Sequence, residues 1–216
     1  MHSPSAEDQW QWHEELSSLA NVCVYALVRD GMRVPPFTQH PDGDNSLRRN
    51  GLTPMLWRRW LEAVLKEMRR HELGQDAQMA QSRARPPQTP GSLCAGPIEL
   101  GRAIDEMWLE SLPAWNRWKA ELTTGRLGIR ERLAPGHYER LWESLRPFHD
   151  VVPDLSIVIV EYAAPTIMPV PPTDAIVALP VDAPADSYAA GVLESARRLA
   201  SFNRSGAAEG QDRPFD

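Results

Sequence analysis

Apolar and basic residues separate onto two sides of one segment, residues 53–74. At 100° per residue, the apolar positions share one side: Trp57, Trp60, Leu61, Val64, Leu65 and Met68. The basic positions share the other side: Arg58, Arg59, Lys66, Arg69 and Arg70. Thr53 followed by Pro54 is typical of a helix start, and Gly74 of a helix end. We therefore predict one long helix with a buried apolar side and an exposed basic side.

The first part of the chain predicts another helix, from Ser5 to about Val28. Ser5 and Asp8 match a capping box, and the apolar residues that follow recur at helical spacing: Trp12, Leu16, Leu19, Ala20, Cys23 and Leu27. Residues 22–28 also fit a strand, because the run is apolar without a break and an Asp-Gly pair at 30–31 is a hairpin signal. The spacing favours the helix, with Asp-Gly as its exit turn.

Polar and proline-rich stretches flank the long helix. Residues 37–51 are dense in Pro, Asp, Gly, Asn and Ser, so we expect a loop there. Residues 75–97 hold four prolines and few apolar residues, which predicts a disordered linker. Helical spacing resumes from Ile98, and Pro113 should kink or restart that helix. A further short helix is predicted up to Leu145, from apolar residues at i, i+3, i+4 and i+7.

Beyond Pro153 the pattern becomes that of short strands. Residues 155–162 are rich in β-branched side chains, and residues 167–170 and 175–179 are candidates to pair with them. The prolines around these runs favour edge or irregular strands over a regular central sheet. Asp186 can then cap a final helix through Phe202.

These elements predict an α+β fold, mainly α, with several amphipathic helices and a small carboxyl-terminal β element followed by a final helix. We expect a Trp-rich, mainly helical region at residues 1–150, since all eight tryptophans lie there. A smaller strand-plus-helix region at residues 151–203 should pack on it, and residues 204–216 should form a free tail.

Composition narrows the class of protein. The longest apolar runs are far shorter than the roughly 20 residues that span a bilayer, so no membrane span is expected. The first residues lack the basic and apolar regions of a signal peptide, which predicts a cytoplasmic protein. Cys23 and Cys94 are too few and too isolated to indicate a disulfide framework. Of 23 basic residues 21 are Arg, which we interpret as the mark of a GC-rich bacterial genome.

Charge singles out the long helix. The chain has a net charge of −6, yet residues 48–85 hold nine bases and four acids, a net charge of 9 − 4 = +5. Three interpretations of the basic side stay open: a solvated helix face, a docking surface for an acidic protein, and a phosphate-binding face. The overall negative charge disfavours nucleic acid. The acidic carboxyl-terminal part could also cover the basic side, within the same molecule or in a neighbour.

Oxygen-rich residues in the loop before the long helix form a weak candidate metal site: His40, Asp42 and Asp44. The register of a Ca²⁺ loop fails, because a loop starting at Asp42 would need Gly and Glu where the chain has Leu47 and Thr53. Asx turns explain such a run without an ion. We therefore predict no metal and no cofactor.

Catalytic signatures are missing from the sequence. It contains no phosphate-binding glycine loop, no dinucleotide fingerprint, no nucleophile elbow and no zinc-binding helix motif. His149 beside Asp150 is a candidate acid/base pair. The tryptophans are expected to fill the core or an interface, with an indole-lined ligand pocket as the alternative: Trp57, Trp60, Trp108, Trp115 and Trp118.

The sequence therefore favours a non-catalytic interaction or accessory subunit that docks an acidic protein through the basic side of residues 53–74. An enzyme or small-ligand-binding protein, with a site among the Trp-bearing helices, is the alternative. Weak nucleic-acid binding is the third hypothesis. Neither the partner nor the oligomeric state follows from the sequence.

Overall fold

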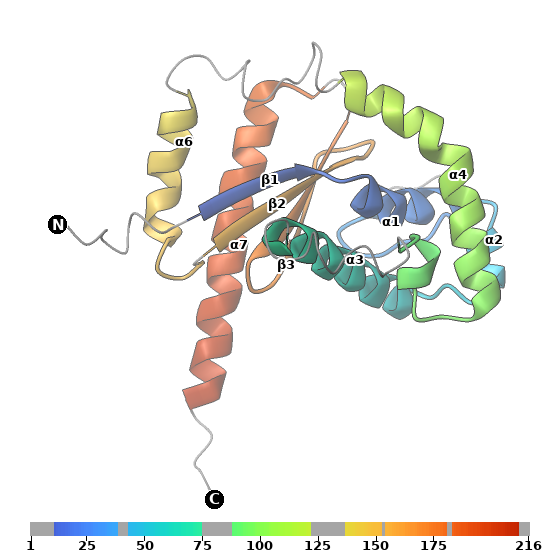
Figure 1. Ribbon diagram of the computed structural model, residues 1–216. Helices are drawn as coiled ribbons and strands as arrows, with labels where there is room; N and C mark the ends of the chain where they lie inside the picture. Colours follow the sequence, from blue (N-terminus) through green and yellow to red (C-terminus); the bar gives the residue numbers. More distant parts are fainter. Residues whose placement is uncertain are drawn as a thin grey trace, which may run out of the picture. The chain divides into compact units, whose positions relative to one another are not determined.

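The computed structural model of the protein describes residues 11–38, 43–74, 88–121, 137–152, 154–180 and 183–211. It combines α-helices with a four-stranded sheet, so the chain is α+β and mainly α, as the sequence predicts. The chain folds as two compact units (Figure 1). The first unit joins residues 1–17 to residues 117–216, and the second spans residues 18–116. The boundaries of these two units do not coincide with the expected division at residue 150.

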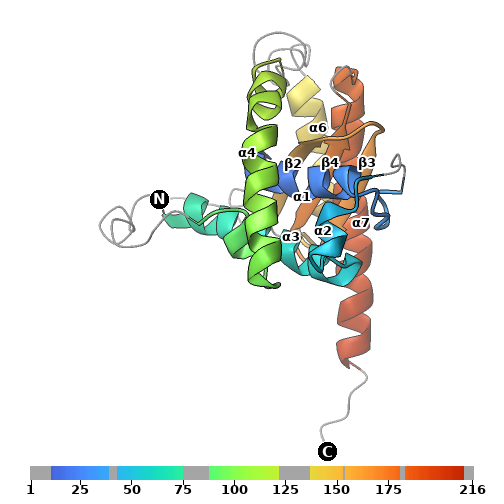
Figure 2. The same cartoon turned by 90° about the vertical axis from the view of Figure 1, so that its right-hand side faces the viewer.

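The sheet belongs to the first unit and has the order β1-β2-β4-β3. Its strands are β1 (Gln11–Leu16), β2 (Asp154–Glu161), β3 (Thr166–Val170) and β4 (Asp174–Leu179). β2 runs parallel to both β1 and β4, whereas β3 is antiparallel to β4. Figure 2 shows β2, β4 and β3 side by side in this order. The sheet is therefore mixed, with β2 and β4 at its centre.

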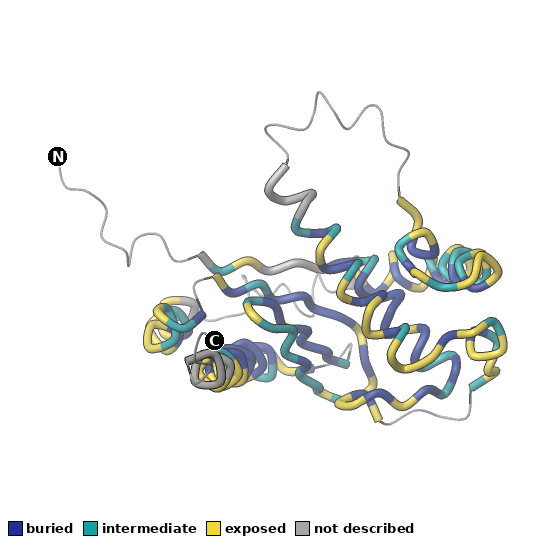
Figure 3. Tube along the Cα trace, turned by 90° about the horizontal axis from the view of Figure 1, so that it is seen from below, coloured by how far each residue is buried: buried dark blue, intermediate teal, exposed yellow. Residues whose placement is uncertain are grey.

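Two helices supply the core on one side of this sheet: α6 (His137–Leu145), which continues into the 3₁₀ turn η5 (Arg146–Phe148), and α7 (Ala185–Gln211). Alternate residues of β2 and β4 join α6 and α7 in one apolar cluster, which includes Leu155, Ile157, Val177, Tyr188 and Leu199. The intervening strand residues, such as Val160 and Ile176, are also buried. Figure 3 colours the chain by burial, and most residues of the central strands β2 and β4 are buried. Burial on both faces explains why β2 is a nearly continuous apolar run.

The strand β1 corrects the helix predicted from Ser5 to Val28. Residues 11–16 lie parallel to β2, with Gln11 opposite Asp154 and Leu16 opposite Ile159, and Trp12 packs against the apolar cluster. Pairing with a strand more than 130 residues away outweighs the local helical spacing, because helix propensity is only a weak preference. The expected start at Ser5 lies outside the described residues.

The strand β4 corrects the expectation of edge or irregular strands. It lies between β2 and β3, and all six of its residues are buried. The prolines of this region flank β4 or lie outside the strands, apart from Pro169 in β3. Since β3 is an edge strand of the sheet, Pro169 leaves no central hydrogen bond unmade.

The helices of the second unit are α1 (Ser18–Arg29), α2 (Ser46–Arg49), α3 (Pro54–Gly74), the 3₁₀ turn η3 (Gly91–Leu93) and most of α4 (Ile98–Glu121). α1 confirms the helical interpretation of residues 22–28, and Gly31 turns the chain after it with φ of 60°. α2 adds a short helix to the loop expected at 37–51. α4 runs through Pro113 as one helix instead of restarting there.

Two segments expected to lack structure are ordered where the structure describes them. Residues 88–97, the end of the expected linker, are held by Asp105 of α4, which accepts hydrogen bonds from Thr89 Oγ1 at 2.8 Å and from the Gly91 N–H at 2.7 Å. Gly91 is buried, and a Cβ there would collide with the carbonyl of Gly101. At the other end of the chain, α7 continues to Gln211 through much of the expected free tail. Residues 75–87 and 212–216 lie outside the described part.

Candidate functional site

The helix α3 begins where the sequence predicts. The hydroxyl oxygen of Thr53 accepts a hydrogen bond from the Leu56 N–H at 3.2 Å, and the Thr53 carbonyl accepts one from the Trp57 N–H at 2.8 Å. These bonds satisfy backbone donors that the first turn of a helix leaves open. Thr53 is therefore the amino-terminal cap, and the helix is fixed from its first turn.

The apolar side of α3 is part of the core of the second unit. Trp57 and Trp60 are fully buried, and Leu61, Val64, Leu65 and Met68 are at most 6% exposed. Both indole N–H groups find carbonyl partners: Trp57 donates to Cys23 at 2.7 Å and Trp60 to Pro90 at 2.9 Å. Buried apolar area and directional bonds together fix how the helix is rotated, and so which residues face solvent.

The opposite side of α3 presents Arg58, Arg59 and Lys66 to solvent, and we call these three residues the exposed basic face. Arg58 donates a long hydrogen bond of 3.4 Å to the Pro35 carbonyl. Within the described part of the chain, the side chains of Arg59 and Lys66 form no hydrogen bond or ion pair. Glu62 lies among the three and is exposed too.

The two remaining basic residues predicted for this surface differ from these three. Arg69 is half-buried and interacts with other groups of the chain. The side chain of Arg70 lies outside what the structure describes. The structure therefore places three of the five predicted residues on one accessible face.

Sequence reasoning missed an apolar member of this surface, Met55. Its side chain is 62% exposed, although methionine is usually buried. Met55, Arg59, Glu62 and Lys66 follow each other at spacings of four, three and four, so they share one stripe of the helix. The helical spacing of the sequence alone could therefore have placed Met55 on the same surface as Arg59 and Lys66.

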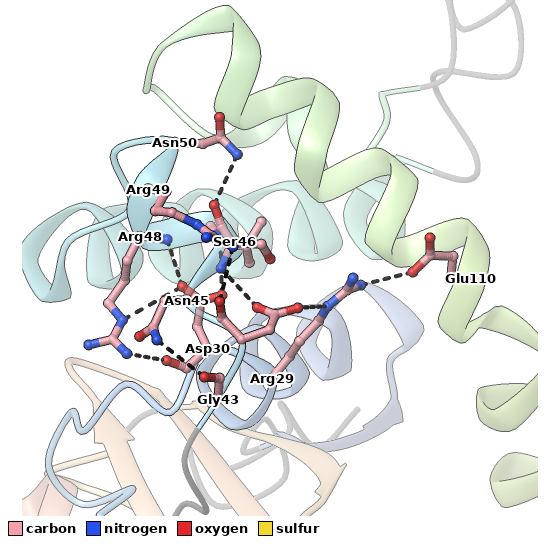
Figure 4. A network of polar contacts seen from close by, with 11 residues as sticks. Arg29, Asp30, Gly43, Asn45, Ser46, Arg48, Arg49, Asn50 and Glu110 are labelled. Atoms are coloured by element: carbon pink, nitrogen blue, oxygen red, sulfur yellow. Dashed lines mark hydrogen bonds and ion pairs between the residues drawn. The ribbon is translucent and has the colours of Figure 1, made fainter.

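Other arginines of the same unit are bound to carboxylates (Figure 4). Arg29 donates from Nε to Asp44 at 3.1 Å and from Nη1 to Glu110 at 3.0 Å. Arg48 donates to the Asp30 carbonyl at 2.7 Å, with its Nε 3.8 Å from the Asp30 carboxylate. The contrast shows that the second unit neutralises some of its arginines internally and leaves Arg59 and Lys66 available.

The carboxylates near the candidate metal loop are used to cap α2 (Figure 4). Asp44 Oδ1 accepts the Ser46 N–H at 2.8 Å, an Asx turn, and this bond with the nearby Arg29 lowers the pKa of Asp44 to about 2. The buried Asp30 accepts the N–H groups of Leu47 at 3.0 Å and Arg48 at 2.6 Å. Asp30 thus caps α2 from outside the helix, since the side chain of Asn45 at the cap position accepts no N–H of the helix and donates instead to the Gly43 carbonyl at 3.2 Å.

The metal prediction is tested only in part, because His40 and Asp42 lie outside the described residues. Among the residues that the structure does describe, no three His, Cys, Asp or Glu side chains gather as metal ligands would. Asp44, the described member of the candidate site, is already engaged by Ser46 and Arg29.

The five tryptophans do not form one described pocket. Trp57 and Trp60 are core residues with nothing exposed. Trp108 and Trp115 pack on each other in α4, with ring centroids 6.2 Å apart at 46°. Trp118 belongs to the first unit, so the structure does not place it relative to Trp57 and Trp60.

The candidate acid/base pair His149 and Asp150 lies in the first unit, after η5. The His149 ring packs edge-on against Trp142, with centroids 5.7 Å apart, and Asp150 is exposed. This arrangement gives His149 a packing contact.

Comparisons of the chain with protein-family models, curated proteins and solved structures found no match. In the part of the chain that the structure describes, no helix has the length and apolar character needed to cross a membrane. The functional proposal therefore rests on the residues of this chain alone.

Proposed function

We propose that the protein is a non-catalytic interaction or accessory subunit, which docks an acidic surface of a protein partner through the exposed basic face of α3. One observation carries this proposal: Arg59 and Lys66 are exposed and unpaired within the described residues, on a helix whose other side is fully buried. A surface held in place before binding loses little conformational entropy when a partner docks.

The composition of the face supports a protein partner over a nucleic acid. Arg58, Arg59 and Lys66 with Glu62 sum to 3 − 1 = +2. A face with so small a net charge can contact only a few phosphates. Nucleic-acid-binding proteins normally make many phosphate contacts and carry a basic surface, whereas this chain is acidic overall. Met55, one turn before Arg59, adds an exposed apolar group, and Met and Arg are both enriched in protein interfaces.

Reversing two charges on this face should disrupt docking. In an Arg59→Glu, Lys66→Glu double variant the sum over the face changes from +2 to −2, so attraction to an acidic surface becomes repulsion. We expect affinity for the partner to fall at least about 100-fold, because like charges across an interface cost several kcal/mol. The partner is first identified by native purification of the wild-type protein from its host, and its affinity is then measured by biolayer interferometry.

The matched control is the double variant Arg102→Glu, Arg117→Glu. Both residues are exposed on α4 and away from α3 in the sequence, and the change in net charge is the same. This control should retain affinity within a few-fold, and both variants should keep the wild-type circular dichroism spectrum. An equal loss in the two variants would show that net charge alone drives the association. Steeply salt-dependent retention of DNA or RNA would instead support the third hypothesis.

A further inference from the structure

The first unit contains a cavity of about 370 Å³ between α7 and the strands β3 and β4, and it is broadly open to solvent. On the strand side its accessible apolar lining is Pro165 and Ile167, whereas Val177 and Leu179 also line it but are at most 3% exposed. Its helical wall is formed by side chains of α7, including Ser187, Glu194 and Arg198. The volume lies within the range of small-ligand pockets in proteins.

The helical wall is hollow because α7 has small residues where it approaches the sheet. Ser187, Ala190 and Gly191 all line the cavity. At Gly191 a Cβ would lie 2.8 Å from Val177 Cγ1, so the helix backbone can pass this close to β4 only with glycine there. The short side chains of Ser187 and Ala190, which precede Gly191, leave open a volume that larger residues would fill.

A guanidinium is held at one end of the cavity. Arg198 Nε donates to Glu194 Oε1 at 2.8 Å, and Arg198 Nη1 donates to the Ile167 carbonyl of β3 at 3.2 Å. These two bonds orient the group, and among the described contacts its Nη2 donors stay unused. Glu194 balances the charge of Arg198 in the lining, so no net charge draws a ligand to this end of the cavity. The unused guanidinium donors of Arg198 instead offer hydrogen bonds that an anion can accept.

We propose that this cavity binds a small amphipathic carboxylate. The apolar body of the ligand lies against Pro165, Ile167 and Ala190, and its carboxylate accepts charge-assisted hydrogen bonds from Arg198. A planar guanidinium already oriented by two bonds loses little freedom on binding. The site lies in the first unit, and it is independent of docking through α3 in the second unit.

Octanoate is the probe that tests this proposal, with octylammonium and octanol as matched cationic and neutral probes. Each is titrated into the ¹⁵N-labelled full-length protein, and the backbone amides of Ala190, Gly191 and Arg198 are followed by NMR. We expect octanoate to shift these amides saturably and to bind at least about tenfold more tightly than the other two, as one additional charge-assisted hydrogen bond would provide. Absence of a saturable shift, or equal affinity for the three probes, would overturn the proposal.

Three variants locate the site. Arg198→Gln should lower octanoate affinity to that of octanol, whereas Arg197→Gln should leave it unchanged, since Arg197 pairs with Glu194 too but does not line the cavity. Ala190→Leu, at an exposed position of the lining, should block all three probes without removing a charge. An equal loss of octanoate binding in Arg197→Gln and Arg198→Gln, or unchanged binding in Ala190→Leu, would place the ligand elsewhere.

Discussion

Replacement of Trp60 by alanine is expected to lower the free energy of unfolding by about 3–5 kcal/mol. The Trp60 side chain is fully buried, and its indole N–H donates to the Pro90 carbonyl at 2.9 Å. The alanine variant therefore leaves a cavity and also removes the donor of a buried carbonyl. Urea denaturation of the wild type and the variant, followed by circular dichroism, measures the difference.

Two further variants separate the contributions to this loss. Trp60→Phe keeps an aromatic ring but no N–H, so it should cost less than Trp60→Ala. Arg59→Ala changes the neighbouring residue on the exposed side and should stay within about 0.5 kcal/mol of wild type. If Trp60→Ala is as stable as Arg59→Ala, Trp60 is not a core residue, and the rotation of α3 that exposes Arg59 and Lys66 loses its basis.

Replacement of Asp30 by alanine is expected to cost about 2–4 kcal/mol, because two backbone donors at the start of α2 lose a charged acceptor. Asp30 is fully buried and accepts the N–H groups of Leu47 and Arg48 (Figure 4). Its ion pair with Arg48 adds little, since the Arg48 side chain is 43% exposed and can be hydrated. The same urea titration measures this effect.

Asp44→Ala is the matched control for Asp30. Asp44 caps the same helix through Ser46, but its side chain is 45% exposed, so water can replace the lost bond. Asp44→Ala should therefore cost clearly less than Asp30→Ala, and Asp30→Asn, which keeps one acceptor oxygen, should fall between them. Equal stability of the two alanine variants would contradict a capping function for the buried carboxylate.

The elements predicted well are those whose signals are local. α3 follows from helical spacing and from Thr53, and each of these signals lies within a few residues of what it specifies. The strand β1 could not be predicted in this way, since the residues that make it a strand are in β2, opposite Gln11 at Asp154. Residues 88–97 were mistaken for linker for the same reason: their order depends on Asp105 in α4.

The candidate site was predictable to a similar degree. Helical spacing was sufficient to place Arg58, Arg59 and Lys66 on the solvent side, because buried tryptophans fix the opposite side. It could not distinguish Arg69, which is half-buried. The cavity beside α7 could not be predicted from the sequence. It depends on the close approach of Gly191 in a helix to Val177 in a strand, and no local sequence pattern relates these two residues.

Site-specific photo-crosslinking tests most directly whether the exposed basic face is the docking surface. A photoreactive amino acid replaces Met55, Lys66 or, as the control, Arg102, and the protein is irradiated in its native host. Docking through α3 predicts that positions 55 and 66 cross-link to an acidic segment of one other protein and that position 102 does not. Cross-links of equal yield from position 102, cross-links only within the chain itself, or none from positions 55 and 66 would contradict it.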